Sequence, residues 1–319
     1  MRPSLDDLRG VIALPPTPCL PDGGNWSATD TVDTVALERL TKNLVRDGVS
    51  GFMITGTLGE GHSLLWDEHK TAIETVVNAA GSDVPVFAGI TSLNTREVIA
   101  KAKFVEGVGA AGILLGAPMW CPASVENAIQ FYLDVAEAVK PLVVLVYHNP
   151  SAFRVYLPPA AFEKMADSGN ILGSKETHFD ILHNLELLRR VKERFGVLVI
   201  DHLMHPLMKM GSPGCWSAWA AMGPWPIRYL FDLCRHGETE KAEQLSAEIR
   251  NAFPSIDWGL FHQHEPAFMR TIFNEAGYDQ AGPVRRPFVH LPESLRTPAV
   301  EAGRKYRALS QKYKNLMTA

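Results

Sequence analysis

Three side chains that suit the chemistry of carbonyl compounds stand at or just beyond the ends of apolar runs. Lys175 closes the run 170–174, Tyr147 closes the run 142–146, and Thr57 follows a third run. A lysine at the mouth of a buried strand is costly to keep charged, and a neutral amine is the nucleophile that forms a Schiff base with a ketone. A phenol beside it could relay protons. Each residue alone has an ordinary explanation, because strand-end lysines are usually solvated or ion-paired and tyrosines often line the rim of a core.

The segment around Thr57 has the composition of an anion-binding turn. Gly56 and Gly59 let the backbone turn tightly, so that amides near Leu58 can converge with the Thr57 hydroxyl on a carboxylate. The alternative is a simple turn between a strand and a helix, in which Glu60 caps the next element. A carboxylate cradle, a phenol and an amine that meet would form a site for an α-keto acid bound as a covalent imine.

The elements that must position these residues alternate along the chain. Strands are expected at 10–14, 51–55, 84–88, 112–115, 142–147, 171–174, 197–200 and 214–217. Eight strands alternating with helices predict parallel βαβ units that close into a (β/α)8 TIM barrel, with functional groups at the carboxyl ends of the strands. The competing architecture is a doubly wound open sheet, but no glycine-rich dinucleotide fingerprint follows the first strand.

Amphipathic segments between the strands predict the helices. They lie at 34–47, 66–80, 95–108, 125–139, 159–167, 179–195, 205–210 and 226–236. Beyond residue 237 the strands stop, and further helices are expected at 238–253, 258–276 and 292–316. We therefore predict a catalytic barrel over 1–237 and a C-terminal helical extension over 238–319 that packs on it.

Composition excludes several classes of function. Of the 319 residues, 46% are apolar and 21% charged, and the formal net charge is −4, so nothing suggests a nucleic-acid or anionic-membrane partner. The four cysteines have no metal-type spacing, no apolar stretch reaches the length of a membrane span, and a signal peptide is not expected. These features predict a cytoplasmic protein without a metal. The pair Arg285-Arg286 is expected to be a solvated surface feature or a subunit contact.

The order of the chemical segments resembles the class I aldolase superfamily that includes dihydrodipicolinate synthase and N-acetylneuraminate lyase. A Gly-Thr-x-Gly-Glu segment at 56–60, the strand-end Tyr147 and a Gly-x-Lys-Glu segment at 173–176 occur in that order. The separation between Tyr147 and Lys175 also matches that family. The resemblance runs over essentially the whole chain.

Within the superfamily, the chain is most similar to the hydratase-aldolases of bacterial polycyclic aromatic catabolism. These enzymes cleave trans-o-hydroxybenzylidenepyruvate or trans-2'-carboxybenzalpyruvate. The matching segments are 15–18, 56–60, 65–68, 93–99, 118–120 and 281–283, together with the Tyr-x-Asn-Pro order at 147–150.

Departures from the synthase pattern favour an aromatic substrate. Synthases carry a Tyr-Tyr pair that lends a phenol to the neighbouring subunit, whereas this chain has Pro118, Met119 and Trp120 there. Synthases also place an arginine where this chain has Ala152, although Arg154 is close by. A polar amino-aldehyde would lose its anchors, while an aromatic ring would gain an indole and a thioether.

The resemblance implies a role for each candidate residue. Lys175 would form the imine, which serves as the electron sink and makes a metal or organic cofactor unnecessary. Tyr147 would relay protons, and Gly56, Thr57 and Leu58 would bind the carboxylate of pyruvate or of an aryl-substituted α-keto acid. The family's usual assembly is a homotetramer, which is also expected here.

The aromatic end of the pocket is assigned less directly. Trp120 and Trp216 are candidates to line it, as is Trp219, although tryptophans are often core anchors instead. Asn149 and His148 could activate the hydrating water or contact an ortho substituent, although His148 could equally point away, since neighbouring strand residues alternate in direction.

Two other functions are compatible with the same residues. The imine chemistry could serve a sugar-acid lyase or a dihydrodipicolinate synthase-like reaction. A non-catalytic barrel that senses pyruvate-like ligands would be expected to have lost part of the set formed by Thr57, Tyr147 and Lys175, and all three are present.

Overall fold

A closed barrel of eight parallel strands forms the centre of the computed structural model, which describes residues 3–177 and 179–318. Residues 1, 2, 178 and 319 lie outside the described residues. They include the first residue of the predicted barrel span (1–237) and the last residue of the predicted helical extension (238–319). The strands pair in chain order and β8 closes on β1. The (β/α)8 barrel predicted from the sequence is confirmed. The strands are β1 (Gly10–Ala13), β2 (Gly51–Ile54), β3 (Val86–Gly89), β4 (Gly112–Leu115), β5 (Val143–His148), β6 (Ile171–Glu176), β7 (Gly196–Ile200) and β8 (Gly214–Ser217).

The strands are apolar on both faces, because helices cover the outside of the barrel and side chains fill its interior. All six residues of β5 are buried, for example. The expected end of β6 at Ser174 was wrong, since the strand continues to Glu176. The two added residues pair with β5, so that Lys175 lies opposite Tyr147 and Glu176 opposite His148.

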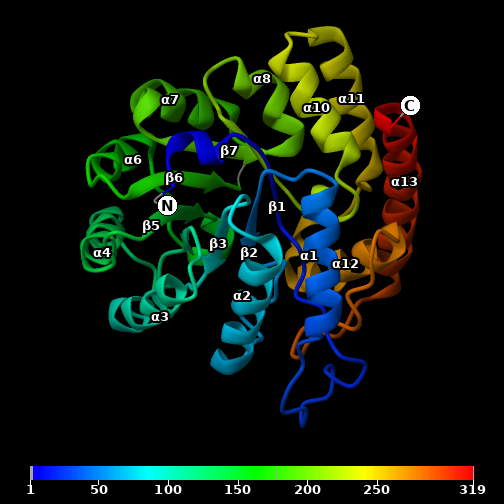
Figure 1. Cartoon of the computed structure of the whole chain (residues 1–319), viewed down its shortest axis with the longest axis horizontal. Coiled ribbons are helices and arrows are strands. Elements are labelled where there is room, and N and C mark those ends of the chain that lie inside the picture. The colour runs from blue at the N-terminus through cyan, green and yellow to red at the C-terminus, as the bar shows by residue number, and fades with distance from the viewer. Residues whose placement is uncertain (1–2, 178, 319) are drawn as a thin grey trace.

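Helices surround the barrel and begin mostly at side chains that cap their first turn. Asn94, Ser124 and Asp180 each accept a hydrogen bond from a backbone N–H three residues later. Figure 1 shows the successive helices around the barrel. Those up to β8 are α1 (Thr34–Arg46), α2 (Trp66–Ala80), α3 (Thr95–Gly107), α4 (Val125–Ala138), α5 (Pro150–Phe153), α6 (Pro159–Ala166), α7 (Ile181–Val191) and α8 (Met204–Met208), with 3-10 turns η1 (Leu5–Leu8), η2 (Lys192–Arg194) and η3 (Asp201–Leu203).

Two short helices were not predicted because they are too short to show a periodic pattern. These are α5 and α9 (Ala218–Ala221), which follow β5 and β8 directly. In α5 the Asn149 side chain accepts from the Ala152 N–H at 3.2 Å, and Pro150 occupies the first helical position. Both helices start at the carboxyl ends of strands and therefore help to shape the mouth of the barrel.

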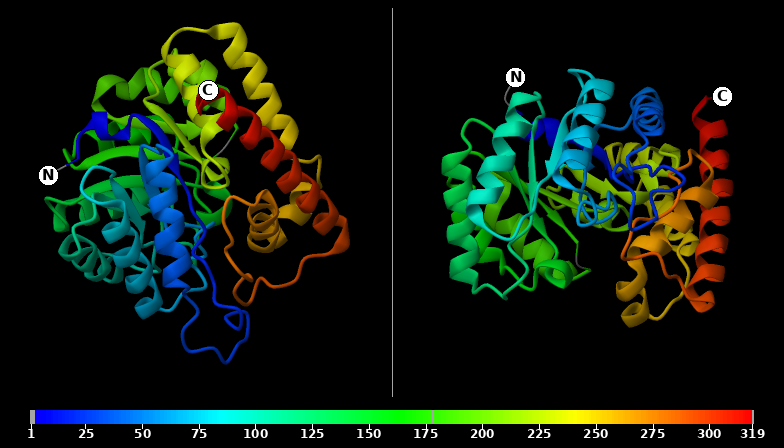
Figure 2. Two further views of the ribbon diagram at one scale, coloured as in Figure 1. Left: turned by 45° about the vertical axis from the view of Figure 1, so that its right-hand side comes forward. Right: turned by 90° about the horizontal axis from the view of Figure 1, so that it is seen from below.

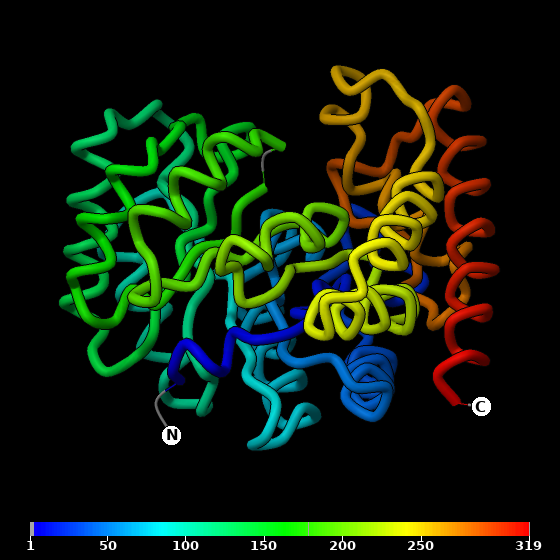
Figure 3. The backbone as a smooth tube through the Cα atoms, turned by 90° about the horizontal axis from the view of Figure 1, so that it is seen from above, coloured from blue at the N-terminus to red at the C-terminus, as the bar shows by residue number. Residues whose placement is uncertain are grey.

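The remaining helices lie together on one side of the barrel. They are α10 (Trp225–Arg235), α11 (Thr239–Ala252), α12 (Trp258–Ala276) and α13 (Glu293–Thr318). Figures 2 and 3 show α13, in red, at the outer edge, with α12, in orange, packed against it on the barrel side. The division of the chain after residue 237 stays a prediction.

Candidate active site

A cavity of about 640 Å³ opens at the carboxyl ends of the strands. Six of the eight site residues expected from the sequence line it, namely Thr57, Leu58, Tyr147, Asn149, Lys175 and Trp216. A seventh, Gly56, lies against the Tyr147 ring, since a Cβ there would be 3.6 Å from Tyr147 Cε1. The barrel thus brings together residues that are far apart along the chain.

The Lys175 amine lies between two aromatic faces. Its Nζ atom is 3.8 Å from the centre of the Tyr147 ring and 4.5 Å from that of the Trp216 ring. Lys175 is 3% exposed, and within the described part of the chain its amine has no hydrogen bond or ion pair. The Trp216 indole is held in place because its Nε1 donates to the carbonyl of Glu176 at 2.7 Å. A buried amine without a carboxylate partner is the environment that favours a nucleophilic lysine.

Tyr147 connects the amine to the turn after β2. Its hydroxyl lies 3.0 Å from Thr57 Oγ1, within hydrogen-bonding distance. The Phe153 ring of α5 packs edge-on against the Tyr147 ring with centres 5.0 Å apart. Phe153 fits there because residue 116 is a glycine, whose added Cβ would lie 2.2 Å from Phe153 Cζ. The unpredicted helix α5 therefore fixes the orientation of the phenol.

A buried ion cluster holds the turn that carries Thr57. Glu60 has a left-handed backbone (φ 53°), which is unfavourable for a residue with a side chain. Its Oε2 atom accepts from Arg270 Nη2 at 2.8 Å and from Arg285 Nη1 at 2.7 Å. The expectation that Arg285 is a solvated surface feature was wrong. It is 2% exposed and also donates to the Thr17, Pro18 and Thr31 carbonyls, because the loop after α12 folds back against the loop after β1.

A second buried network lies behind the barrel wall. His148 and Glu176 directly follow Tyr147 and Lys175, so their side chains point to the opposite face of the sheet. His148 Nδ1 and Glu176 Oε2 are 2.6 Å apart. His183 of α7 places its Nε2 at 3.5 Å from the same oxygen. His148 therefore points away from the cavity and cannot activate water there.

Two histidines and a carboxylate in such a cluster suggest a metal site at first sight, because their ligand atoms lie within 4.8 Å of one another. The backbone N–H of Leu157, however, donates to His148 Nε2 at 3.1 Å. Because Nε2 accepts that bond, the ring proton of His148 is on Nδ1, the nitrogen that faces Glu176. A protonated Nδ1 has no lone pair to offer a metal ion. The contacts are those of a hydrogen-bonded network.

The far end of the cavity is aromatic, and most of it was not foreseen. Trp219 lines it as considered, and so do Phe179, Phe253 and Trp258. The Phe253 and Trp258 rings are parallel, with centres 5.7 Å apart. Phe253 and Trp258 were not predicted because they lie beyond the last strand, at the end of α11 and the start of α12, whose place on the barrel is set by packing.

Trp120 was expected at the site but does not line the cavity in the structure. It is 77% exposed and is not among the described residues that line the cavity. Its carbonyl accepts from Arg154 Nη1 at 3.0 Å, which fastens the loop after β4 to the end of α5. A role for Trp120 in substrate binding stays a prediction.

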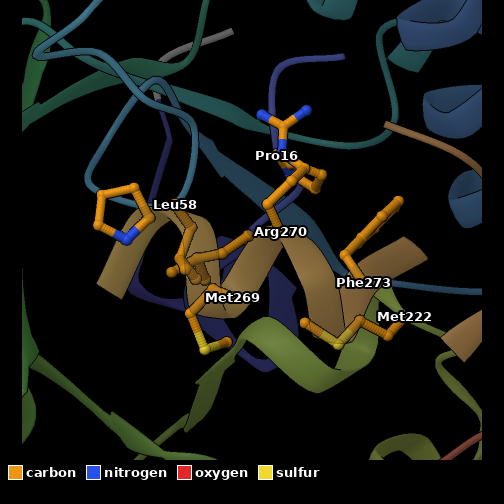
Figure 4. A pocket seen from close by; sticks show the side chains of 8 residues that line it. Pro16, Leu58, Met222, Met269, Arg270 and Phe273 are labelled. Atoms are coloured by element: carbon orange, nitrogen blue, oxygen red, sulfur yellow. The ribbon is translucent and has the colours of Figure 1, made fainter. Parts of the chain in front are cut away.

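The turn that carries Thr57 and Leu58 also contacts helix α12. Leu58 and Met269 line a small adjacent cavity of about 20 Å³, together with Met222 of the loop after α9 and Phe273 of α12. Figure 4 shows these side chains converging between α12 and the turn. Helix α12, which lies beyond the last strand of the barrel, thus forms one wall of the cavity.

Comparisons with known proteins agree with this architecture. Residues 7–302 match the dihydrodipicolinate synthetase family. The chain is 33% identical to the trans-o-hydroxybenzylidenepyruvate hydratase-aldolase of Sphingobium xenophagum, over 98% of this chain and 97% of that protein. It is 31% identical to the trans-2'-carboxybenzalpyruvate hydratase-aldolase of Nocardioides sp. (strain KP7), over 96% and 95%. The solved structure of PhdJ bound to a substrate intermediate has a TM-score of 0.94 at 33% identity, covering 98% of this chain and 99% of that one.

The barrel and its buried strand-end lysine are those of a class I aldolase, an enzyme that works through a lysine Schiff base. More specifically, the chain belongs to the dihydrodipicolinate synthetase family. The resemblance noted in the sequence is confirmed. Over residues 3–177 and 179–318, no helix combines the length and apolar character needed to cross a membrane.

Proposed function

We propose that this enzyme is a hydratase-aldolase of polycyclic aromatic hydrocarbon degradation. It converts a trans-arylidenepyruvate and water into an aromatic aldehyde and pyruvate. The two candidate substrates are trans-o-hydroxybenzylidenepyruvate and trans-2'-carboxybenzalpyruvate, because relatives named for each span nearly the whole chain. The observation that carries the proposal is the position of Lys175 Nζ between the rings of Tyr147 and Trp216, in a cavity whose far end is aromatic.

Imine formation uses the inner end of the cavity. The Thr57 hydroxyl and the backbone amides around Leu58 bind the substrate carboxylate. The neutral Lys175 amine attacks the C2 ketone, and Tyr147 moves the protons that allow water to leave. The hydrogen-bonding distance of 3.0 Å between the Tyr147 hydroxyl and Thr57 Oγ1 supports this arrangement, since one substrate could contact both groups.

The iminium then carries the chemistry of the remaining steps. Its positive charge withdraws electrons from the C3=C4 double bond, so that water adds at C4. The Tyr147 and Trp216 ring faces that flank Nζ stabilise this charge. Tyr147 then removes the proton of the C4 hydroxyl, the C3–C4 bond breaks, and the aldehyde leaves. Hydrolysis of the remaining enamine releases pyruvate and Lys175. Because the electron sink is the imine itself, the mechanism requires no metal or organic cofactor.

We also propose a cytoplasmic homotetramer, as the family resemblance implies. Large apolar side chains such as Trp120 and Leu182, each 77% exposed, are available for subunit contacts. The four cysteines are free thiols, which suits a reducing compartment. Sedimentation of the purified protein as a monomer at micromolar concentration would contradict the tetramer.

The experiment that tests the function follows the loss of the conjugated enone absorbance when the enzyme is mixed with each candidate substrate. Rapid loss, with release of pyruvate, is the expected result, and the faster substrate identifies the ortho substituent. Lys175→Ala should abolish both signals and the mass adduct that borohydride forms with pyruvate. Lys209→Ala, an exposed lysine, is the matched control and should retain them.

An enzyme that forms the pyruvate adduct but consumes neither enone would disprove the hydratase-aldolase function. It would redirect the search to aliphatic and sugar-derived keto acids. A Lys175→Ala variant with near-normal turnover would disprove the imine mechanism itself.

A further inference from the structure

One face of helix α12 forms a wall of the active-site cavity. Phe261, Glu265 and Met269 are spaced four residues apart, and all three line the cavity. The order along the helix also follows the expected order along a bound substrate. Met269 lies near Leu58 and the carboxylate end, while Phe261 lies near the aromatic end.

Glu265 therefore stands between the two ends of the cavity. It is one helical turn from Met269, or about 6 Å along the helix axis. The atoms of an arylidenepyruvate that lie between its carboxylate and its ring are C2, C3 and C4. Lys175 binds C2 and lines the same cavity as Glu265, so we place the Glu265 carboxyl group beside C3 and C4.

The Glu265 carboxyl group is also available for chemistry. The cavity is lined by two acidic residues of the described chain, Glu265 and Asp201. Asp201 is engaged, because it accepts from Ser217 Oγ at 2.6 Å and from the His202 N–H at 2.7 Å. Within the described ranges Glu265 has no hydrogen bond and no ion pair, so none of those residues holds its carboxyl group in a fixed contact.

We propose that Glu265 is the acid–base residue that hydrates the C3=C4 bond of the Lys175 imine, an inference that rests on the function proposed above. The carboxylate removes a proton from water as the water oxygen bonds to C4. The C3=C4 electron pair moves to form C2=C3, and the iminium becomes a neutral enamine. Glu265 then returns the proton to C3, which regenerates the iminium and completes the addition of one water.

The electrostatic surroundings suit this role. Burial raises the pKa of Glu265 above its ordinary value, and the nearby charge of His262 lowers it to a smaller extent. A carboxylate with a raised pKa is a stronger base, and it holds the proton until that proton is passed to C3. Conversion of the neutral Lys175 amine into an iminium brings a cationic nitrogen into the cavity, which favours the ionised form of Glu265 for the first proton transfer.

The test separates hydration from cleavage. Benzylidenepyruvate requires both steps, whereas its hydrated form, 4-hydroxy-4-phenyl-2-oxobutanoate, requires cleavage alone. Glu265→Gln keeps the size of the side chain and breaks no hydrogen bond or ion pair with a described residue, so the variant should fold. It should lose about 10²–10⁴-fold in the rate of enone consumption. It should still release pyruvate from the hydrated compound and form the borohydride adduct at rates close to those of the unmodified enzyme.

Three controls make the result specific. Glu275→Gln alters a carboxylate of the same helix that pairs with Arg304 outside the cavity, and should leave both steps unchanged. Glu265→Asp should recover part of the hydration rate. His262→Gln tests the neighbouring imidazole as the base. Loss of hydration in His262→Gln with its retention in Glu265→Gln would overturn the proposal.

The unmodified enzyme and Glu265→Gln together distinguish a wrong role for Glu265 from a wrong function for the enzyme. Equal losses of hydration and cleavage in Glu265→Gln, or no loss of either, would overturn the role of Glu265 while the function stands. Failure of the unmodified enzyme to consume enone would overturn the function and this inference with it.

Discussion

Lys175 and Tyr147 are directly opposite each other in the ladder between β5 and β6, and the Lys175 Nζ atom lies 3.8 Å from the centre of the Tyr147 ring. The next residue on each strand forms a second pair behind the sheet, where His148 and Glu176 meet at 2.6 Å. One register therefore sets both the pair that lines the cavity and the buried pair behind it. A shift of β6 by one residue would turn Lys175 and Glu176 to the wrong faces of the sheet.

Removing the phenol should slow the enzyme without preventing substrate binding. Tyr147→Phe keeps the ring against Lys175 but loses the hydroxyl that lies 3.0 Å from Thr57. We expect kcat to fall by roughly two to four decades. Steady-state kinetics on the faster enone substrate measure the effect. A kcat within a few-fold of the unmodified enzyme would remove Tyr147 from the proton transfers, and far-ultraviolet circular dichroism checks that the variant is folded.

The buried pair should act through the position of the lysine. Glu176→Gln removes the carboxylate that holds His148 and the end of β6, and should lower kcat by up to about 10²-fold through misplacement of the neighbouring residue. It should also destabilise the protein by about 1–3 kcal/mol. The rate of borohydride trapping with pyruvate reports directly on the amine. Normal trapping together with normal kcat would show that the pair serves stability alone.

Two adjacent arginines offer a matched test of the ion cluster. Arg285 is buried on Glu60, whereas Arg286 is exposed. Arg285→Ala should cost about 3–5 kcal/mol because it leaves part of the Glu60 charge buried without its partner. Arg286→Ala should change the stability by less than about 0.5 kcal/mol. Urea denaturation of both variants measures the difference, and similar midpoints would contradict a structural role for the cluster.

Since Glu60 follows Thr57 by one short turn, the same variant should affect binding. We expect Arg285→Ala to raise the KM for the enone substrate, because the turn that carries the carboxylate-binding groups loses its anchor. An unchanged KM in folded Arg285→Ala protein would show that the turn keeps its shape without the cluster.

His69 predicts a loss of stability in mild acid. Burial lowers the pKa of His69 from 6.5 to about 4, and its Nε2 lies 3.0 Å from the carbonyl of Gly89, the last residue of β3. Above pH 6.5 the ring is neutral in both the folded and the unfolded chain. As the pH falls from 6.5 towards 4, the unfolded chain binds a proton that the folded one does not, so stability falls by on the order of 3 kcal/mol.

The free energy of unfolding at several pH values between 7 and 4 tests this prediction. His69→Gln should show a shallower decline over that range, because glutamine can donate to the same carbonyl but does not titrate. His236→Gln, at an exposed position, is the control and should follow the unmodified protein. An equal decline in His69→Gln would assign the acid sensitivity to other groups.

The sequence by itself was enough to predict the barrel and the juxtaposition of Tyr147 and Lys175. Apolar runs of strand length are local signals, and parallel strands in a barrel bring their carboxyl ends to one face whatever the loops between them. Tyr147 and Lys175 could therefore be placed together from the runs that precede them. The length of β6 could not be predicted, because Lys175 and Glu176 are polar residues that join the strand through pairing with its neighbours.

Only the tertiary structure shows which C-terminal residues form a wall of the site and which charged side chains are buried near it. Glu265 and Trp258 lie on a helix beyond the last strand, and no local pattern states which part of the barrel that helix covers. Arg285 carries a charge that sequence reasoning assigns to solvent, yet it is buried because Glu60, 225 residues earlier, compensates it. Strand and helix patterns depend on residues that are close in the sequence. The partner of a buried charge and the walls of a cavity come instead from distant segments that meet only in the folded chain.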